Sequence, residues 1–175
     1  MSAPEPLQSI RRGLEDTQQQ YEADSDDERP LGGYVALGAV YATGVAAFAT
    51  SVRRRGVPVP ERPKPGDLAL MAVATHKMSR LLTKDAVTSP IRAPFTRFEE
   101  PTGASEVKEE AREGPVRHAV GELLTCPFCL DVWVATAIGA GLIAAPRATR
   151  WVTAVLASVA ASDALHFAYD KLKDA

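Results

Sequence analysis

The sequence predicts an all-α membrane helical bundle with three spans, one short interfacial helix and a disordered acidic N-terminal tail. Three observations lead to this prediction. The 175 residues include three long segments almost free of charge, 13 Pro that favour short elements, and only 5 Phe, which argues against strands. The net charge of -2 provides no basic field for nucleic acid, and 2 Cys cannot support a disulfide-rich scaffold.

Residues 1–30 form the predicted disordered tail. They are polar, carry an acidic run at 24–28, and hold too few apolar residues to offset the entropy of ordering the chain. A short helix over Leu7–Tyr21 is the one element that this stretch would support.

Residues 31–52 form the first predicted transmembrane helix. These 22 residues carry no charge and would span about 33 Å, enough for a hydrocarbon core of roughly 30 Å. A buried soluble helix is one alternative, but such a helix is rarely apolar on every face. A cleaved signal peptide is the other, but it would need a basic start close to the N-terminus.

Residues 53–65 are rich in Pro and Arg and predict an extended linker. Residues 66–82 then predict a helix with Asp67 as its N-cap. The uncharged part of this helix is short, because basic residues begin at His76. We therefore expect it to lie at the membrane interface rather than to cross.

Residues 83–125 predict a charged, exposed segment that is helical in part. Residues 126–145 and 151–169 form the second and third predicted transmembrane helices, with Trp151 and Tyr169 at the ends of the last one, where amphipathic rings favour membrane interfaces. If 66–82 does not cross, most Lys and Arg fall inside. The positive-inside rule then predicts an external N-terminus and a cytoplasmic central segment and C-terminus.

The CPFC motif from Cys126 to Cys129 begins the second-last predicted span. A helix N-terminus favours the thiolate of the first Cys, which is the chemistry of redox motifs. Two thiolates at this spacing can also reach one zinc ion, with His118 as the nearest His, although a closed zinc site needs four ligands. The third interpretation is that both Cys pack as small apolar residues at a helix start.

Two further groups of polar residues are candidate sites. The first would form a polar network with carboxylates or bind lipid headgroup phosphate, a solvated loop being the alternative. Its members are Arg80, Lys84, Asp85, Arg92 and Arg97. The second is Asp163 with His166, which share one face of the last predicted span as intramembrane polar residues, either in a bundle pathway or as a hydrated interface pair.

Three stretches together resemble the bacterial membrane family DUF1360. They are RLLTKD at 80–85, SPIRAPF at 89–95 and GELLTCPFCL at 121–130, followed by Trp133. The resemblance covers about residues 66–170, and we treat residues 66–175 as one membrane region. The family includes a sporulation-associated membrane protein. It implies a small multi-pass membrane protein without an activity to carry over. The residues that match its pattern are Arg80, Asp85, Arg92, Cys126, Cys129 and Trp133.

We therefore expect a multi-pass protein of the bacterial inner (cytoplasmic) membrane with a structural or interaction role in the cell envelope, linked to sporulation by the resemblance. The alternative is a thiol redox or metal-binding module, with zinc at Cys126 and Cys129. The expected partners are the lipid bilayer and a membrane protein or second copy, not nucleic acid. The sequence holds no phosphate loop or HExxH-type site, so we expect no firm catalytic residue or cofactor.

Overall fold

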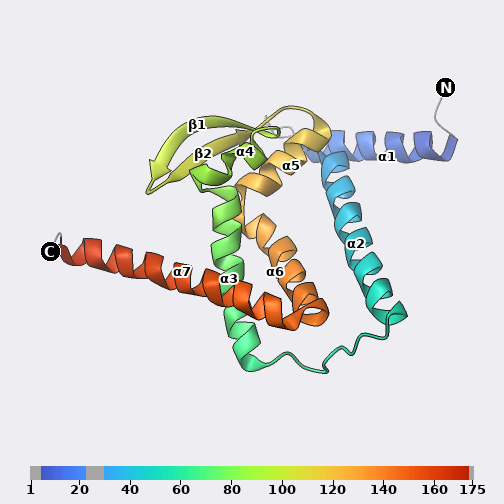
Figure 1. The fold of residues 1–175 in the computed structure, drawn as a ribbon. Helices are drawn as coiled ribbons and strands as arrows, with labels where there is room; N and C mark the ends of the chain where they lie inside the picture. The colour runs from blue at the N-terminus through green and yellow to red at the C-terminus, as the bar shows by residue number, and fades with distance from the viewer. Residues whose placement is uncertain (1–4, 23–29, 174–175) are drawn as a thin grey trace.

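The computed structural model describes residues 5–22 and 30–173, and this part of the chain is mainly helical (Figure 1). Four long helices follow the N-terminal helix and are joined by a small mixed segment. The elements are α1 (Glu5–Glu22), α2 (Leu31–Arg54), α3 (Pro65–Thr83), the 3-10 turn η1 (Ala86–Thr88), α4 (Ser89–Arg92), β1 (Thr96–Gly103), β2 (Glu106–Ala111), α5 (Pro115–Thr125), α6 (Pro127–Ala144) and α7 (Pro146–Lys173).

The helix α1 occupies most of the tail that the sequence predicts to be disordered. Its sequence places Leu7, Ile10 and Leu14 at helical spacing, which is the pattern of an amphipathic helix. The acidic run at 24–28 lies outside the described residues.

The expectation of a purely α-helical chain is corrected by a two-stranded antiparallel sheet of β1 and β2. Burial alternates along β2, as it does in a strand with one covered face. Val107 is buried, while Lys108 turns outward and pairs with Glu99 of β1 at 2.8 Å. Ser105 makes the turn with a φ of 67°. The sheet is extended at its edge by the Val107 amide, which donates to the Lys84 carbonyl at 2.9 Å.

Residues 84–125, which hold η1, α4, β1, β2 and α5, form a cap at one end of the long helices (Figure 1). Residues 55–64 form the linker, which lies at the opposite end, together with the turn between α6 and α7 (Figure 1). The cap end and the linker end are therefore the two ends of the helical bundle.

The helix α3 lies at the centre of the bundle and packs along both α6 and α7. It buries small side chains on this side, namely Ala74, Thr75, Ser79 and Thr83. Small residues allow the close approach of neighbouring helices. The helix α2 instead packs mainly on α5, where Gly33 is buried, and it leaves its second half uncovered (Figure 1).

Three helices of the described chain, α2, α6 and α7, are long and apolar enough to cross a membrane. They correspond to the three segments that the sequence predicts to span, and α6 is one residue shorter at each end than the predicted 126–145. The last one begins earlier and ends later than residues 151–169, because Pro146 starts the helix directly after the turn and no breaker follows Tyr169. The helix predicted at 66–82 is α3, one residue longer at each end.

Candidate functional site: a polar cleft beside the cap

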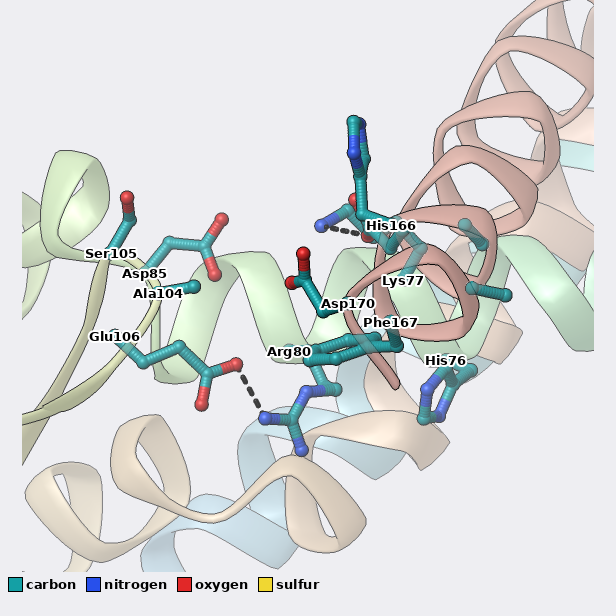
Figure 2. A pocket seen from close by; sticks show the side chains of 13 residues that line it. His76, Lys77, Arg80, Asp85, Ala104, Ser105, Glu106, His166, Phe167 and Asp170 are labelled. Atoms are coloured by element: carbon teal, nitrogen blue, oxygen red, sulfur yellow. Dashed lines mark hydrogen bonds and ion pairs between the residues drawn. The ribbon is translucent and has the colours of Figure 1, made fainter. Parts of the chain in front are cut away.

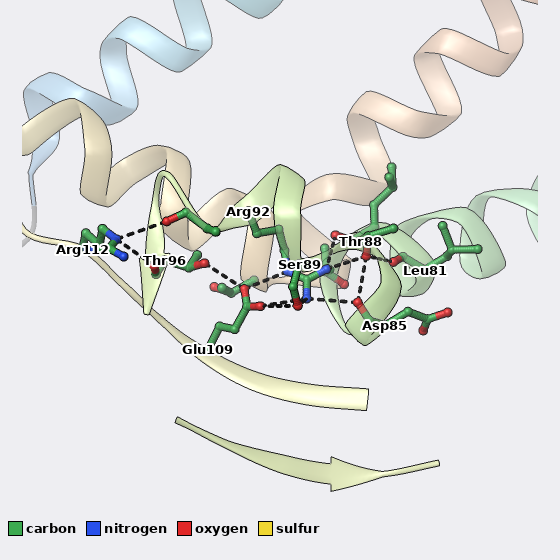
Figure 3. A network of polar contacts seen from close by, with 12 residues as sticks. Leu81, Asp85, Thr88, Ser89, Arg92, Thr96, Glu109 and Arg112 are labelled. Carbon is green, nitrogen blue, oxygen red and sulfur yellow. Dashed lines mark hydrogen bonds and ion pairs between the residues drawn. The ribbon is translucent and has the colours of Figure 1, made fainter. Parts of the chain in front are cut away.

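The cap is built around the buried side chain of Arg92, which has no solvent-exposed surface (Figure 3). Its Nε donates to Oε2 of Glu109 at 2.8 Å, and its Nη2 donates to Oε1 at 3.0 Å. The same guanidinium donates to the carbonyls of Leu82 and Asp85 at 2.9 and 3.1 Å. One side chain thus joins the end of α3, the turn η1 and the strand β2.

Glu109 receives further hydrogen bonds from Ser89 at 2.9 Å and from Thr96 at 2.8 Å. Burial raises the pKa of the Glu109 carboxyl, but the hydrogen bonds from Arg92, Thr96 and Ser89 and the charge of Arg92 outweigh burial. The pKa of Glu109 is therefore lowered from its ordinary value. A carboxylate that stays charged and is fully bonded gives this network a structural role.

A polar cleft of about 700 Å³ lies between α3, α7 and the turn of the cap hairpin (Figure 2). Most of its walls carry ionisable or polar side chains rather than apolar ones. The side chains of this type are His76, Lys77, Arg80, Asp85, Ser105, Glu106, Asp163, His166 and Asp170. Those on α3 and α7 lie three and four residues apart, so that each helix turns one polar face toward the cleft, whereas Asp85, Ser105 and Glu106 belong to the cap.

Two ion pairs cross this cleft. Lys77 Nζ lies 2.9 Å from Asp163 Oδ2 and joins α3 to α7. Arg80 pairs with Glu106 and joins α3 to the cap hairpin (Figure 2). The remaining ionisable groups, His76, Asp85, His166 and Asp170, have no side-chain hydrogen bond or ion pair among the described residues. With four carboxylates against Lys77 and Arg80, the cleft is acidic when both His are neutral.

The structure distributes the candidate residues of the polar groups over two places. Arg80, Asp85, Asp163 and His166 meet in the cleft. Arg92 lies in the buried network of the cap and cannot reach a headgroup from there. Neither Lys84 nor Arg97 lines the cleft.

Sequence reasoning missed His76, Lys77, Glu106 and Asp170 as members of this cleft. The spacing of Asp163, His166 and Asp170 on one face of α7 was a signal that could have found the last of them. Glu106 could not be found in this way, because the hairpin that carries it was not expected.

The CPFC motif caps the start of α6. Cys126 is the N-cap residue, and its Sγ accepts the backbone N–H of Cys129 at 3.2 Å. Both Cys are free thiols, with Cys126 half-buried and Cys129 exposed. A capping sulfur satisfies one of the open N–H groups of a helix start, so this geometry is sufficient for a packing role.

The same motif lacks the companions that zinc would need. His118 lies on α5, where its Nε2 is 3.5 Å from a carboxylate oxygen of Glu122. Across residues 5–22 and 30–173, no group of three or more His, Cys, Asp or Glu side chains is placed to hold a metal ion. The described part of the chain therefore gives no support to the redox or metal alternative, and the chemistry that its geometry offers is electrostatic.

Comparison with known proteins places this architecture in a family. The sequence profile of a family described as "Protein of unknown function (DUF1360)" matches residues 70–169. The chain belongs to this family. The match begins in α3 and ends in α7, so the DUF1360 region contains the cap, the CPFC motif and every cleft residue except Asp170, and it leaves out α1 and α2. The resemblance seen in the sequence is thereby confirmed.

A curated DUF1360-like relative is "Sporulation protein YjcA" from Bacillus subtilis (strain 168). It is 30% identical over 93 residues, which cover 51% of this chain and 79% of the relative. No solved structure matches the chain.

Proposed function

We propose that this DUF1360 protein is a multi-pass protein of the bacterial cytoplasmic membrane with a structural or interaction role, linked to sporulation like the relative that carries that name. The observation that carries the proposal is the uncovered apolar surface of its helices. In the most apolar stretch of each helix, 0% of α2, 11% of α6 and 6% of α7 is buried inside the protein. Apolar surface costs about 25 cal/mol per Å² in water, so a lipid environment is the favourable one.

The interaction part of the proposal rests on α2. One of its faces carries Gly38, Ala42 and Ala46 at four-residue spacing, and a side chain added at Gly38 would meet nothing within 4 Å. Small residues at this spacing let a second membrane helix approach closely. We propose that a helix of another membrane protein, or of a second copy, packs there.

Fractionation tests the membrane assignment. After expression in a bacterium, the protein should sediment with membranes, resist extraction by alkaline carbonate and urea, and dissolve only in detergent. Release by carbonate alone would contradict the proposal. The same membranes test the α2 interface by chemical crosslinking. Ala42→Leu should weaken any crosslinked product, whereas the control Val40→Leu, on another face of the helix, should not; equal products would remove the interface.

A further inference from the structure

The directions of α2 and α6 restrict how the chain can pass through a membrane. At the cap end, the Tyr34 hydroxyl donates to the Glu122 carboxylate, just before α6 begins. Two turns further along α2, Tyr41 packs edge-on against Trp133 with ring centroids 5.1 Å apart, and its hydroxyl lies 2.8 Å from Thr136 Oγ1. The first contact lies on α5 just before α6 begins and the second lies on α6, so contacts advance along α2 as they advance along the chain into α6. The helices α2 and α6 therefore run in the same direction, from the cap end to the linker end (Figure 1).

The helix α3 runs in the opposite direction over the same distance. Its first turn meets the first turn of α7, where the Arg150 guanidinium donates to both oxygens of Asp67 at 2.8 Å. Its last turn reaches the cap, where the Leu82 carbonyl accepts from Arg92. With 19 residues, α3 is about 28 Å long, close to a hydrocarbon core of roughly 30 Å.

The charges of α3 do not prevent it from crossing, because each has a partner within the protein. Asp67 pairs with Arg150 and Lys77 pairs with Asp163, both on α7. Arg80 pairs with Glu106 of the cap. Ionisable side chains inside a membrane bundle are tolerated where they face its interior and pair with one another.

We infer that the chain crosses the membrane four times, through α2, α3, α6 and α7 in alternating directions. The inference rests on the proposed membrane location. Two successive spans that run in the same direction require a return crossing between them, and α3 is the element that makes it. The linker and the α6–α7 turn then lie on one side of the membrane, and the cap lies on the other side together with α1 and the last turn of α7.

This arrangement differs from the one that the charges alone predict. That comparison favoured three spans because it kept the linker in the cytoplasm whether or not α3 crossed. A four-span chain can also be oriented with the cap in the cytoplasm and the linker outside the cell, and the Lys and Arg of the cap then lie in the cytoplasm. The cap contains more of them, so the positive-inside rule is compatible with four spans.

Site-directed labelling distinguishes the two arrangements. Single Cys residues would be introduced at four exposed positions of the full chain in a Cys126→Ser, Cys129→Ser background, one variant at a time. The variants are Gln19→Cys in α1, Val59→Cys in the linker, Ala104→Cys in the cap hairpin and Ala145→Cys in the α6–α7 turn. Each is treated in intact and in permeabilised cells with a membrane-impermeant maleimide.

Four spans group the positions in one way only. Val59→Cys and Ala145→Cys should be labelled from one side, and Gln19→Cys and Ala104→Cys from the other. Grouping of Val59→Cys with Ala104→Cys, against the other two, is the three-span pattern and would overturn the inference. Carbonate extraction of each variant separates this outcome from failure of the proposed membrane location, in which all four positions react alike and the protein is released.

A second measurement covers the case in which the Cys-free background does not fold. Peptide epitopes inserted after Pro60 and after Gly103, with both native Cys kept, are detected by antibody before and after permeabilisation. Epitopes on opposite sides support four spans, and epitopes on the same side exclude them.

Discussion

Arg92 and Glu109 form an ion pair that is withdrawn from solvent, with side chains that are 0% and 5% exposed. The pair joins α4 to β2, and the other hydrogen bonds of Arg92 reach the end of α3 (Figure 3). The desolvation of two charges is compensated here by hydrogen bonds to all sides of the guanidinium and to both carboxylate oxygens. Buried polar contacts therefore hold the centre of the cap together, beside the buried apolar side chains of Val107 and Ala119.

Removal of one partner of this pair should be strongly destabilising. Arg92→Ala leaves the carboxylate of Glu109 buried without its cation, and such losses cost about 3–5 kcal/mol. Thermal unfolding of the purified protein in detergent should show a lower Tm. The matched control is Arg97→Ala on the exposed side of β1, which should change the Tm little. A similar Tm for both variants would mean that the buried pair does not hold the cap.

The pH dependence of stability should carry the signature of Glu109. Its pKa is lowered in the folded protein, whereas an unfolded Glu titrates near ~4.3. Its contribution to stability is therefore complete above that pH and is lost as the pH falls toward the folded pKa. Glu109→Gln should be less stable at neutral pH and should show a shallower loss of Tm in acid. The exposed control Glu110→Gln should keep the slope of the unchanged protein, and an unchanged slope in Glu109→Gln would argue against this assignment.

The long helices could be predicted from sequence because their signal is local. Charge-free stretches and proline boundaries locate α2, α6 and α7 within a few residues, with the largest error at the long ends of α7. The role of α3 was not visible in the same way. Its charges predict an interfacial helix, and the residues that pair with them lie far along the chain: Arg150 and Asp163 of α7 and Glu106 of the cap.

The residues of the candidate site could be predicted from the sequence only in part, for the same reason. The sequence singled out Arg80 and Asp163, but not the residues that pair with them, Glu106 and Lys77. Glu106 lies on a strand whose charged sequence resembles a solvated segment. A hairpin stabilised by charge pairs and by one buried Val has no apolar run that would reveal it.

Gly33 should be intolerant of any side chain. A Cβ there would clash with the Pro115 carbonyl oxygen and lie 2.8 Å from the Ala119 Cβ, so α2 would have to move away from α5. We expect Gly33→Ala to lower stability by about 1–3 kcal/mol, as overpacking does. The control Gly44→Ala lies on a different face of α2 from Gly38, meets nothing within 4 Å and should be neutral or slightly stabilising. Unfolding in detergent measures both, and equal Tm values would show that α2 and α5 do not pack tightly.

The capping role of Cys126 predicts a graded response. Cys126→Ser keeps an acceptor for the Cys129 amide, whereas Cys126→Ala removes it and should cost about 1 kcal/mol, the usual value of an N-cap. Cys129→Ala removes a thiol that caps nothing and should cost less. Unfolding of the three variants under reducing conditions measures the difference. If Ser and Ala at position 126 are equally stable, the sulfur does not act as a cap.

The ion pair of Asp67 with Arg150 should contribute more than an ordinary surface pair. It has two hydrogen bonds of 2.8 Å and joins the first turns of α3 and α7, and the Asp67 side chain is only 13% exposed. A double-mutant cycle with Asp67→Asn and Arg150→Gln should give a favourable coupling that 0.5 M salt changes little.

The control cycle uses Lys108 and Glu99 on the hairpin, a pair with one contact and side chains that are 56% and 33% exposed. Exposed pairs contribute little to stability and are screened by salt, so this coupling should be smaller and should decrease further in 0.5 M salt. Couplings of equal size and equal salt dependence would mean that Asp67 and Arg150 form a solvated pair that does not contribute to the packing of α3 on α7. A coupling that is larger and insensitive to salt would support a neutralised α3 within the bundle, because the two charges then have no comparable alternative in the solvent.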